Sequence, residues 1–198
     1  MFSHKRRAFD RTEQARTAID MKSRQTPLIQ TYVSQPEQAV IIDSAKTDSR
    51  YTPTADAIHT QVDFGIGNPA SQHIGVHTAV GGDSDYPNPG ELLSAALASC
   101  LDATIRIIAN RLGLPLRRLA VSVDASVDVR GTLRVCQQVP TGFQTIDIAV
   151  DIEPAVPVAD DQIAGLIKAA EQSCVVLQTL MSSPTIELAI HSNDGPGQ

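Results

Sequence analysis

The stretch YPNPGELLSAALASC, residues 86–100, predicts the start of a long helix that is apolar on nearly every side. Asn88 can cap this helix, Pro89 suits its first position, and Glu91 lies three residues after the cap, as in a capping box. The helical pattern continues through ATIRIIANRL to Gly113, a residue type that commonly follows a helix. About 23 residues make a helix roughly 35 Å long, which suits the central element of a domain.

A second helix is expected to begin near Asp160 or Asp161, either of which can cap it, and to end before Pro184. Its apolar residues recur at helical spacing and predict one buried stripe. The members of this stripe are Ile163, Leu166, Ile167, Ala170, Cys174, Leu177 and Met181. Cys174 is therefore expected to face the core.

Alternation of apolar and polar residues predicts long strands over residues 118–130 and 146–152, and a last strand over residues 186–190. Residues 27–82 are interpreted as short strands in QAVIID, IHTQVDFG and HIGVHTAVGG, separated by the loops TDSRYTPTAD and NPASQ. The order is strands, helix, two strands, helix, strand. This order predicts an α+β fold.

The chain has 198 residues, 42% of them hydrophobic but only 4% aromatic, so one domain with an aliphatic core is expected. We divide it into a basic N-terminal arm or helix, residues 1–26, and a single domain, residues 27–198. The net charge is −6, yet the first 24 residues carry seven Lys/Arg against three Asp/Glu. The remainder therefore carries −10, which disfavours a nucleic-acid partner.

The basic N-terminus lacks the apolar region of a secretory signal, and we expect no segment long enough to span a membrane. Three widely spaced cysteines do not make the disulfide framework of a secreted protein. A cytoplasmic location follows as an expectation. We expect no cofactor, because the sequence has no phosphate-binding loop. We expect no metal site, because His73 and His77 would lie about 13 Å apart on a strand, too far to share one ion.

The residues around Cys100 resemble the signature helix of the OsmC/Ohr family, named for osmotically inducible protein C and organic hydroperoxide resistance protein. In that family an Asn-Pro turn, a Glu and an Ala/Leu-rich helix precede the first cysteine. A second cysteine opens a Cys-Pro-Val motif, for which this chain has Cys174 followed by Val175. The resemblance covers roughly residues 58–190. It implies an interlocked homodimer with its active sites at the interface.

The resemblance implies a thiol-dependent peroxidase that acts on organic hydroperoxides. Cys100 would be the peroxidatic thiol and Cys174 the resolving thiol, and an external dithiol would reduce the disulfide between them. Cys136 lies outside the family motifs, and a packing role is predicted for it. One alternative is a non-enzymatic protein of the same fold with a hydrophobic small-ligand pocket at the dimer interface. Another is a structural protein whose basic N-terminal helix docks on an acidic partner.

A reactive thiolate needs a stabilising charge, and the helix dipole is too weak for Cys100, which lies about three turns from the helix start. In the family an Arg from an early loop supplies the charge, and a Glu directly after Asn-Pro holds that Arg. Gly90 takes the place of this Glu, and Glu91 follows one residue later. Glu91 therefore has two candidate roles, a supporting residue of the site or a member of the capping box.

Three side chains are candidates for the cation beside the thiolate. Arg50 lies in roughly the loop where the family has its Arg. His59 and His77 lie on predicted strands and could act as protonated imidazoles, although each could equally be an ordinary strand histidine. Arg106 lies about 240° around the helix from Cys100 and is expected to face elsewhere.

Overall fold

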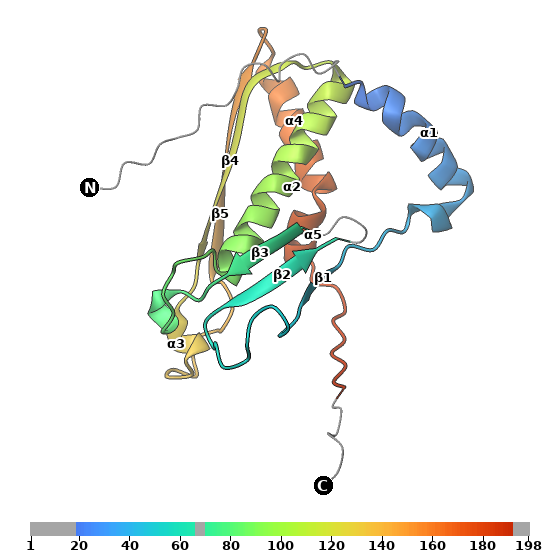
Figure 1. The fold of residues 1–198 in the computed structure, drawn as a ribbon. Helices are drawn as coiled ribbons and strands as arrows, with labels where there is room; N and C mark the ends of the chain where they lie inside the picture. Colours follow the sequence, from blue (N-terminus) through green and yellow to red (C-terminus); the bar gives the residue numbers. More distant parts are fainter. Residues whose placement is uncertain (1–18, 66–69, 192–198) are drawn as a thin grey trace, which may run out of the picture.

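The computed structural model describes residues 19–65 and 70–191, and it has the α+β architecture that the sequence predicts (Figure 1). Two short 3₁₀ helices, η2 and η3, lie among the larger elements. In chain order the elements are α1 (Met21–Ser34), η2 (Pro36–Ala39), β1 (Ala45–Thr47), β2 (Thr60–Phe64), β3 (Ala70–Ile74), η3 (Thr78–Val80), α2 (Pro89–Leu112), β4 (Leu116–Ser126), α3 (Val129–Thr132), β5 (Thr145–Pro154), α4 (Asp160–Ser173) and α5 (Val175–Met181).

Helix α2 begins and ends where the sequence predicts. The Asn88 side chain accepts a hydrogen bond from the Glu91 N–H at 3.1 Å, and the Glu91 carboxylate accepts one from the Asn88 N–H at 2.8 Å. Gly113 ends the helix in the left-handed conformation, with φ of 69°. One side of the helix is fully buried along a stripe with a spacing of four residues: Leu97, Leu101, Ile105 and Ala109.

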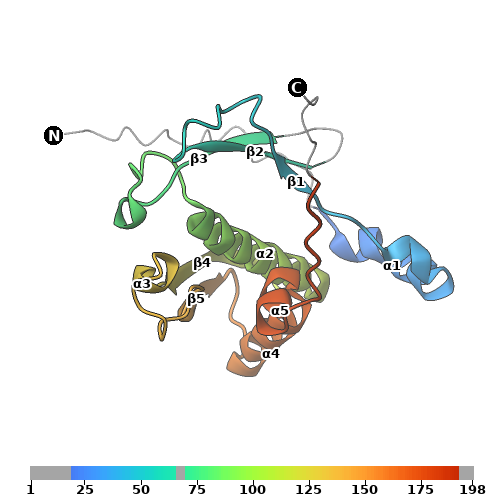
Figure 2. The ribbon, with the colours of Figure 1, turned by 90° about the horizontal axis from the view of Figure 1, so that it is seen from below.

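Two antiparallel sheets lie on opposite sides of α2 (Figure 2). The first sheet has the order β1–β2–β3, and the second is the β4–β5 pair, in which Val121 lies opposite Val150. The inner face of β4–β5 packs on the core that α2 shares with α4, as the alternation predicts. The outer face carries residues such as Ser122 and Asp124, which are exposed.

The N-terminal third differs from the sequence interpretation. Residues 27–34 belong to α1, which Asp20 caps by accepting a hydrogen bond from the Ser23 N–H at 3.1 Å. In QAVIID, residues 40–43 are exposed and form no strand, because the segment lacks the polar–apolar alternation of a half-buried strand. β3 takes in residues 70–72 of the expected NPASQ loop and ends at Ile74. The rest of the strand expected over HIGVHTAVGG is not formed, and Thr78–Val80 form the 3₁₀ helix η3.

In the second half, one expected strand is shorter than predicted and another is not formed in the described chain. β4 ends at Ser126 because Asp128 caps the short helix α3, its carboxylate accepting the Arg130 N–H at 3.0 Å. Cys136 lies in the loop between α3 and β5. Residues 186–190 run without strand partners in the described part of the chain, and Ile186, Leu188 and Ile190 are 80–86% exposed.

The second predicted helix is divided at Cys174, whose backbone is extended with φ of −77° and ψ of 106°. α4 starts after Ala159, so neither Asp160 nor Asp161 is the cap; the Gln162 side chain accepts the Ala159 N–H instead, at 3.3 Å. Val175 then takes the first position of α5. This position tolerates proline, because its N–H has no partner within the helix.

The expectation that no segment matches a membrane span in length is wrong for α2. Its 24 residues are long and apolar enough to cross a bilayer. The core helix of a soluble protein has the same properties, and the buried stripe of α2 packs on α4, α5 and β4 of its own chain.

Since α5 begins at Val175, Val175→Pro should leave the free energy of unfolding unchanged or raise it by about 0.4–1 kcal/mol. Gln178→Pro is the matched control, because the Gln178 N–H donates to the Cys174 carbonyl at 2.9 Å. That change should cost about 3 kcal/mol. Urea denaturation measures both, and equal losses would mean that the helix runs unbroken through Cys174.

Candidate functional site

The two cysteines of the sequence motifs lie close together, on different helices. α2 carries Cys100, and α2 packs against both α4 and α5, at whose junction Cys174 lies. Cys174 is fully buried within the core cluster, and the half-buried Cys100 packs against that cluster. Both are free thiols. The thiol of Cys100 is near enough to contribute to the pKa of Cys174.

Burial is the main influence on Cys174 and raises the pKa of its thiol. The backbone N–H groups of Leu177 and Val176, at the start of α5, act in the opposite direction on that pKa, and the neighbouring Cys100 adds to the rise. Cys174 is therefore a neutral thiol around pH 7. Cys100, in contrast to Cys174, is only half-buried.

Glu91 lies in the capping box of α2, as one of its two candidate roles requires. Its carboxylate accepts hydrogen bonds from the backbone N–H of Asn88 at 2.8 Å and from the Asn88 side-chain amide at 3.0 Å. These bonds use the carboxylate to satisfy N–H groups at the helix start.

The absence of a side chain at position 90 has a structural reason that the sequence alone does not show. A Cβ at this position would lie 3.0 Å from Cζ of Phe143 and 3.1 Å from the side-chain oxygen of Asn88. Phe143, in the loop before β5, thus packs on the first turn of α2, where the family motif has a glutamate. Sequence reasoning missed Phe143 because no local pattern links it to α2.

Arg50 is paired within its own loop. Its guanidinium donates through Nε to the Asp48 carboxylate at 2.7 Å and also forms an ion pair with it through Nη2. The Arg50 guanidinium lowers the pKa of Asp48 to about 2. The Arg50 side chain is 73% exposed, and its guanidinium is paired with Asp48.

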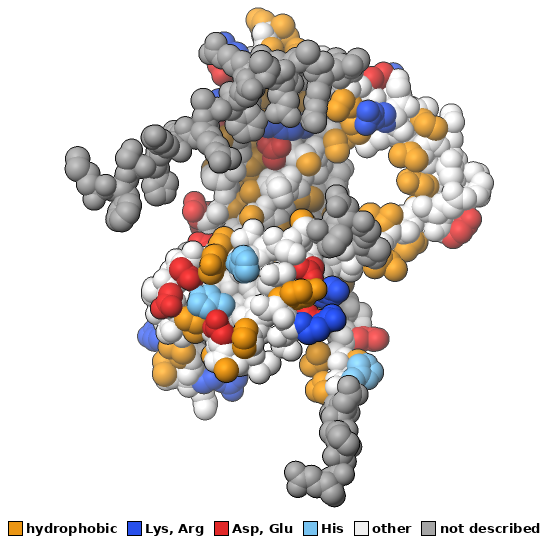
Figure 3. Space-filling view, in the orientation of Figure 1, with side chains coloured by type: hydrophobic (Ala, Val, Ile, Leu, Met, Phe, Trp, Pro, Cys, Tyr) orange, Lys and Arg blue, Asp and Glu red, His pale blue; other side chains and the backbone are white. Residues whose placement is uncertain are grey.

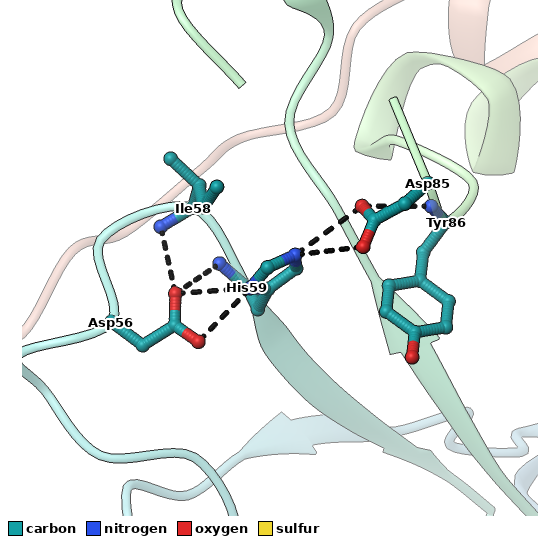
Figure 4. A network of polar contacts seen from close by, with 5 residues as sticks. All are labelled: Asp56, Ile58, His59, Asp85 and Tyr86. Carbon is teal, nitrogen blue, oxygen red and sulfur yellow. Dashed lines mark hydrogen bonds and ion pairs between the residues drawn. The ribbon is translucent and has the colours of Figure 1, made fainter. Parts of the chain in front are cut away.

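His59 lies between two carboxylates (Figure 4). Its Nδ1 is 2.9 Å from an oxygen of Asp56, and its Nε2 is 3.1 Å from an oxygen of Asp85. Both ring nitrogens are therefore engaged with carboxylates. His77 caps η3 instead of lying in a strand, and its Nδ1 accepts the Ala79 N–H at 2.9 Å. Arg106, which is expected to face away from Cys100, pairs with Asp102 one turn earlier in α2, at 2.6 Å.

A cavity of about 440 Å³ lies between α2, β5 and the α4–α5 pair. Its walls are apolar apart from Glu171, and Leu101 and Leu177 place it next to both cysteine-bearing segments. The lining residues are Leu101, Ile105, Ile148, Val150, Ile152, Ile163, Ile167, Glu171 and Leu177. Among residues 19–65 and 70–191, no group of three or more His, Cys, Asp or Glu side chains is arranged to hold a metal ion.

The family model for OsmC-like proteins matches residues 81–189, from the loop before α2 to the exposed C-terminal segment. Among curated proteins, the chain is 29% identical over 122 residues to peroxiredoxin OsmC of Escherichia coli K12. That match covers 61% of this chain and 78% of the relative.

Solved structures of the same fold include an organic hydroperoxide resistance protein OsmC from Legionella pneumophila, with a TM-score of 0.52 and 17% identity over 72% of this chain and 91% of that one. An organic hydroperoxide resistance protein from Elizabethkingia anophelis gives a TM-score of 0.53 and 16% identity over 73% and 91% of the two chains. At these identities the likeness shows the fold.

The capping role of Glu91 predicts how its variants behave. Glu91→Gln keeps an acceptor for the Asn88 N–H and should lower the free energy of unfolding by at most the charge–dipole contribution, about 0.3–1 kcal/mol. Asn88→Ala removes the cap itself and should cost about 1 kcal/mol. Thermal denaturation measures both, and a stable Glu91→Gln protein that has lost peroxidase activity would instead assign Glu91 a role in the chemistry.

Proposed function

Because the chain belongs to the OsmC-like protein family, we propose that it is a thiol-dependent peroxidase that reduces organic hydroperoxides. The observation that carries the proposal is the pairing of an accessible thiol, Cys100, with a buried one, Cys174, at the contact of α2 with α4 and α5. Relatives and neighbours named peroxiredoxin and organic hydroperoxide resistance protein support this class of reaction.

The exposure of the two thiols supports the proposed order of their reactions. Cys100 can meet a substrate, so its thiolate attacks the terminal oxygen of the hydroperoxide; an S–O bond forms, the O–O bond breaks and the alcohol leaves with a proton. Cys174 is closed to solvent and kept neutral by burial. In the reaction its thiol loses its proton and its sulfur attacks the sulfenic sulfur of Cys100: the S–S bond forms, the S–O bond breaks, and the hydroxide leaves with the proton as water. An external dithiol then reduces the disulfide. A dithiol supply favours a reducing compartment such as the cytoplasm.

The charge that activates Cys100 is best supplied by a second copy of the chain. Arg50, His59 and Arg106 are each paired with carboxylates of their own chain. A homodimer would place further side chains beside the accessible face of Cys100. One face of α2 is both exposed and built of small residues, which permits a close approach by a neighbouring helix: Ala95, Ala96, Ser99 and Ala103.

The exposed C-terminal segment supports the same assembly. Ile186, Leu188 and Ile190 alternate with Glu187 and Ala189, the pattern of a strand with one apolar face. In the described chain this face is open to solvent. We assign the segment to the edge of a sheet in a second copy of the chain. There the apolar face of residues 186–190 would be buried and their backbone N–H and C=O groups would be hydrogen-bonded.

The apolar cavity favours a second candidate function, the binding of a small hydrophobic ligand without turnover. Its volume of about 440 Å³ lies within the range of ligand pockets, and Glu171 gives it one polar group. The two functions differ in their need for thiols. A binding protein keeps its ligand affinity when Cys100 becomes Ser, whereas a peroxidase loses turnover.

With a small dithiol as reductant, the protein should consume an alkyl hydroperoxide over many turnovers. Cys100→Ser should abolish the reaction, because no sulfenic acid can form. Without the dithiol, Cys174→Ser should give one stoichiometric turnover and stop at the sulfenic acid of Cys100, because this acid has no internal partner, whereas wild type should stop at the disulfide. Cys136→Ser is the matched control and should behave as wild type. Equal turnover by wild type and Cys100→Ser would exclude the peroxidase mechanism.

Leu188→Asp tests the assembly, because Leu188 is 86% exposed and its replacement should not disturb the folding of a single chain. If residues 186–190 bury their apolar face on a second copy, this change should weaken the dimer in sedimentation velocity. Stability should also depend on protein concentration in wild type. Glu187→Gln, on the opposite face of the segment, is the control. A wild type that remains monomeric at all concentrations would contradict the interlocked dimer.

A further inference from the structure

The bridge formed by Asp56, His59 and Asp85 joins two parts of the chain that otherwise touch little. Strands β1, β2 and β3 contact mainly one another, and the largest packing contacts of α2 are with β4, α4 and α5. His59 directly precedes β2, whereas Asp85 lies in the loop that leads into α2. The contact of His59 with Asp85 therefore ties the first sheet to the start of the cysteine-bearing helix (Figure 4).

The loop from Gly75 to Asn88 is held closely against the end of β3. The Gly75 N–H donates to the Pro87 carbonyl at 3.1 Å, and the Ser84 N–H donates to the Val76 carbonyl at 3.0 Å. A Cβ at Gly75 would lie 3.0 Å from the Asp85 carboxylate and 3.2 Å from the Tyr86 carbonyl oxygen, so this close approach favours glycine. Asn88, the cap of α2, follows Asp85 by three residues, so the contact with His59 lies just before the start of the helix.

The bridge needs a protonated imidazole. A neutral imidazole has one N–H, so only one carboxylate would receive a hydrogen bond and the other would face a lone pair. The imidazolium donates from both nitrogens, to Asp56 at 2.9 Å and to Asp85 at 3.1 Å. The charged groups that face the ring are Asp56 from its own loop and Asp85 from the loop before α2. The edge-on ring of Tyr86 also faces it, 5.7 Å away between centroids.

We propose that His59 is a protonation-dependent latch that fastens the β1–β2–β3 sheet to the loop that starts α2. Below the point at which the imidazole loses its proton, both carboxylates are bound and the sheet is held. Above it, one of the two contacts is lost and the loop is held less tightly against the sheet. This device is independent of the proposed peroxidase activity, because it concerns only the attachment of the sheet.

The surroundings of His59 set the pH range of the latch. The hydrogen bond to Asp56 is the main cause that raises the pKa of His59 above its ordinary value of 6.5, with the Asp85 contact adding to it and partial burial opposing it. The pKa of Asp56 is lowered, chiefly by the hydrogen bond from His59. Because the folded pKa of His59 is raised, the stabilisation is fully present below about pH 6.5 and is lost as pH rises through the folded value.

Amide hydrogen exchange of peptides covering residues 73–92, measured from pH 6 to pH 9 and corrected for intrinsic exchange, tests the latch. In wild type, protection should fall by about two- to fivefold across this range, the effect expected of one partly exposed ion pair. His59→Gln should show the lower protection at every pH. His73→Gln is the matched control. The His73 ring packs on the ring of Tyr86 but does not bridge two carboxylates, so this variant should behave as wild type.

Asp85→Asn keeps the shape of the bridge and removes one charge, so it covers the case in which the His59 variant fails to fold. In this variant the NMR titration of His59 should move to lower pH than in wild type, and protection of residues 73–92 should become less dependent on pH. Wild-type pH dependence of protection in His59→Gln would overturn the latch, as would a His59 titration that Asp85→Asn leaves unchanged.

Discussion

The burial of one side of α2 against α4 is the interaction on which the rest of the structure depends. Leu97, Leu101, Ile105 and Ala109 form a continuous buried stripe, and Leu166, Ala170 and Cys174 meet it from the other helix. Fully burying a leucine or isoleucine stabilises a protein by about 1.5–3 kcal/mol. The same contact sets the relation of the two thiols, since Cys174 belongs to the buried set and Cys100 lies next to Leu101. A core contact and a candidate redox pair thus share one interface.

The sequence predicts α2, β4 and β5 well because their signals are local. Asn88 and Glu91 form the capping box that their spacing suggests, and the alternation around Val121 and Val150 places one face on the core. The helix break at Cys174 is not visible in the pattern, because Val175 can continue a helix as readily as start one. For residues 186–190 the alternation is present, but no strand of the described chain pairs with them. Such a pattern identifies an apolar face without identifying what covers it.

The candidate site, like the fold, has one part that the sequence predicts and another that it does not. The motif spacing indicates both cysteines, and the structure brings them together through contacts between helices that are distant in sequence. Which side chain acts on Cys100 cannot be read from spacing, since Arg50 and His59 find carboxylates within a few residues of themselves. Phe143 against Gly90 is a contact between distant segments and has no local signal. The division of the chain at residue 26 stays a prediction, with α1 extending across it.

The most direct test of the account is the product formed when the reduced protein meets one equivalent of an alkyl hydroperoxide without any reductant. Peptide mapping by mass spectrometry should find a disulfide between Cys100 and Cys174, with Cys136 still a free thiol and the hydroperoxide converted to its alcohol. That result would connect the accessible thiol, the buried thiol and the O–O bond in one reaction. Unchanged thiols and intact hydroperoxide would contradict the account, as would a Cys100 oxidised to the sulfinic acid beside an unreacted Cys174.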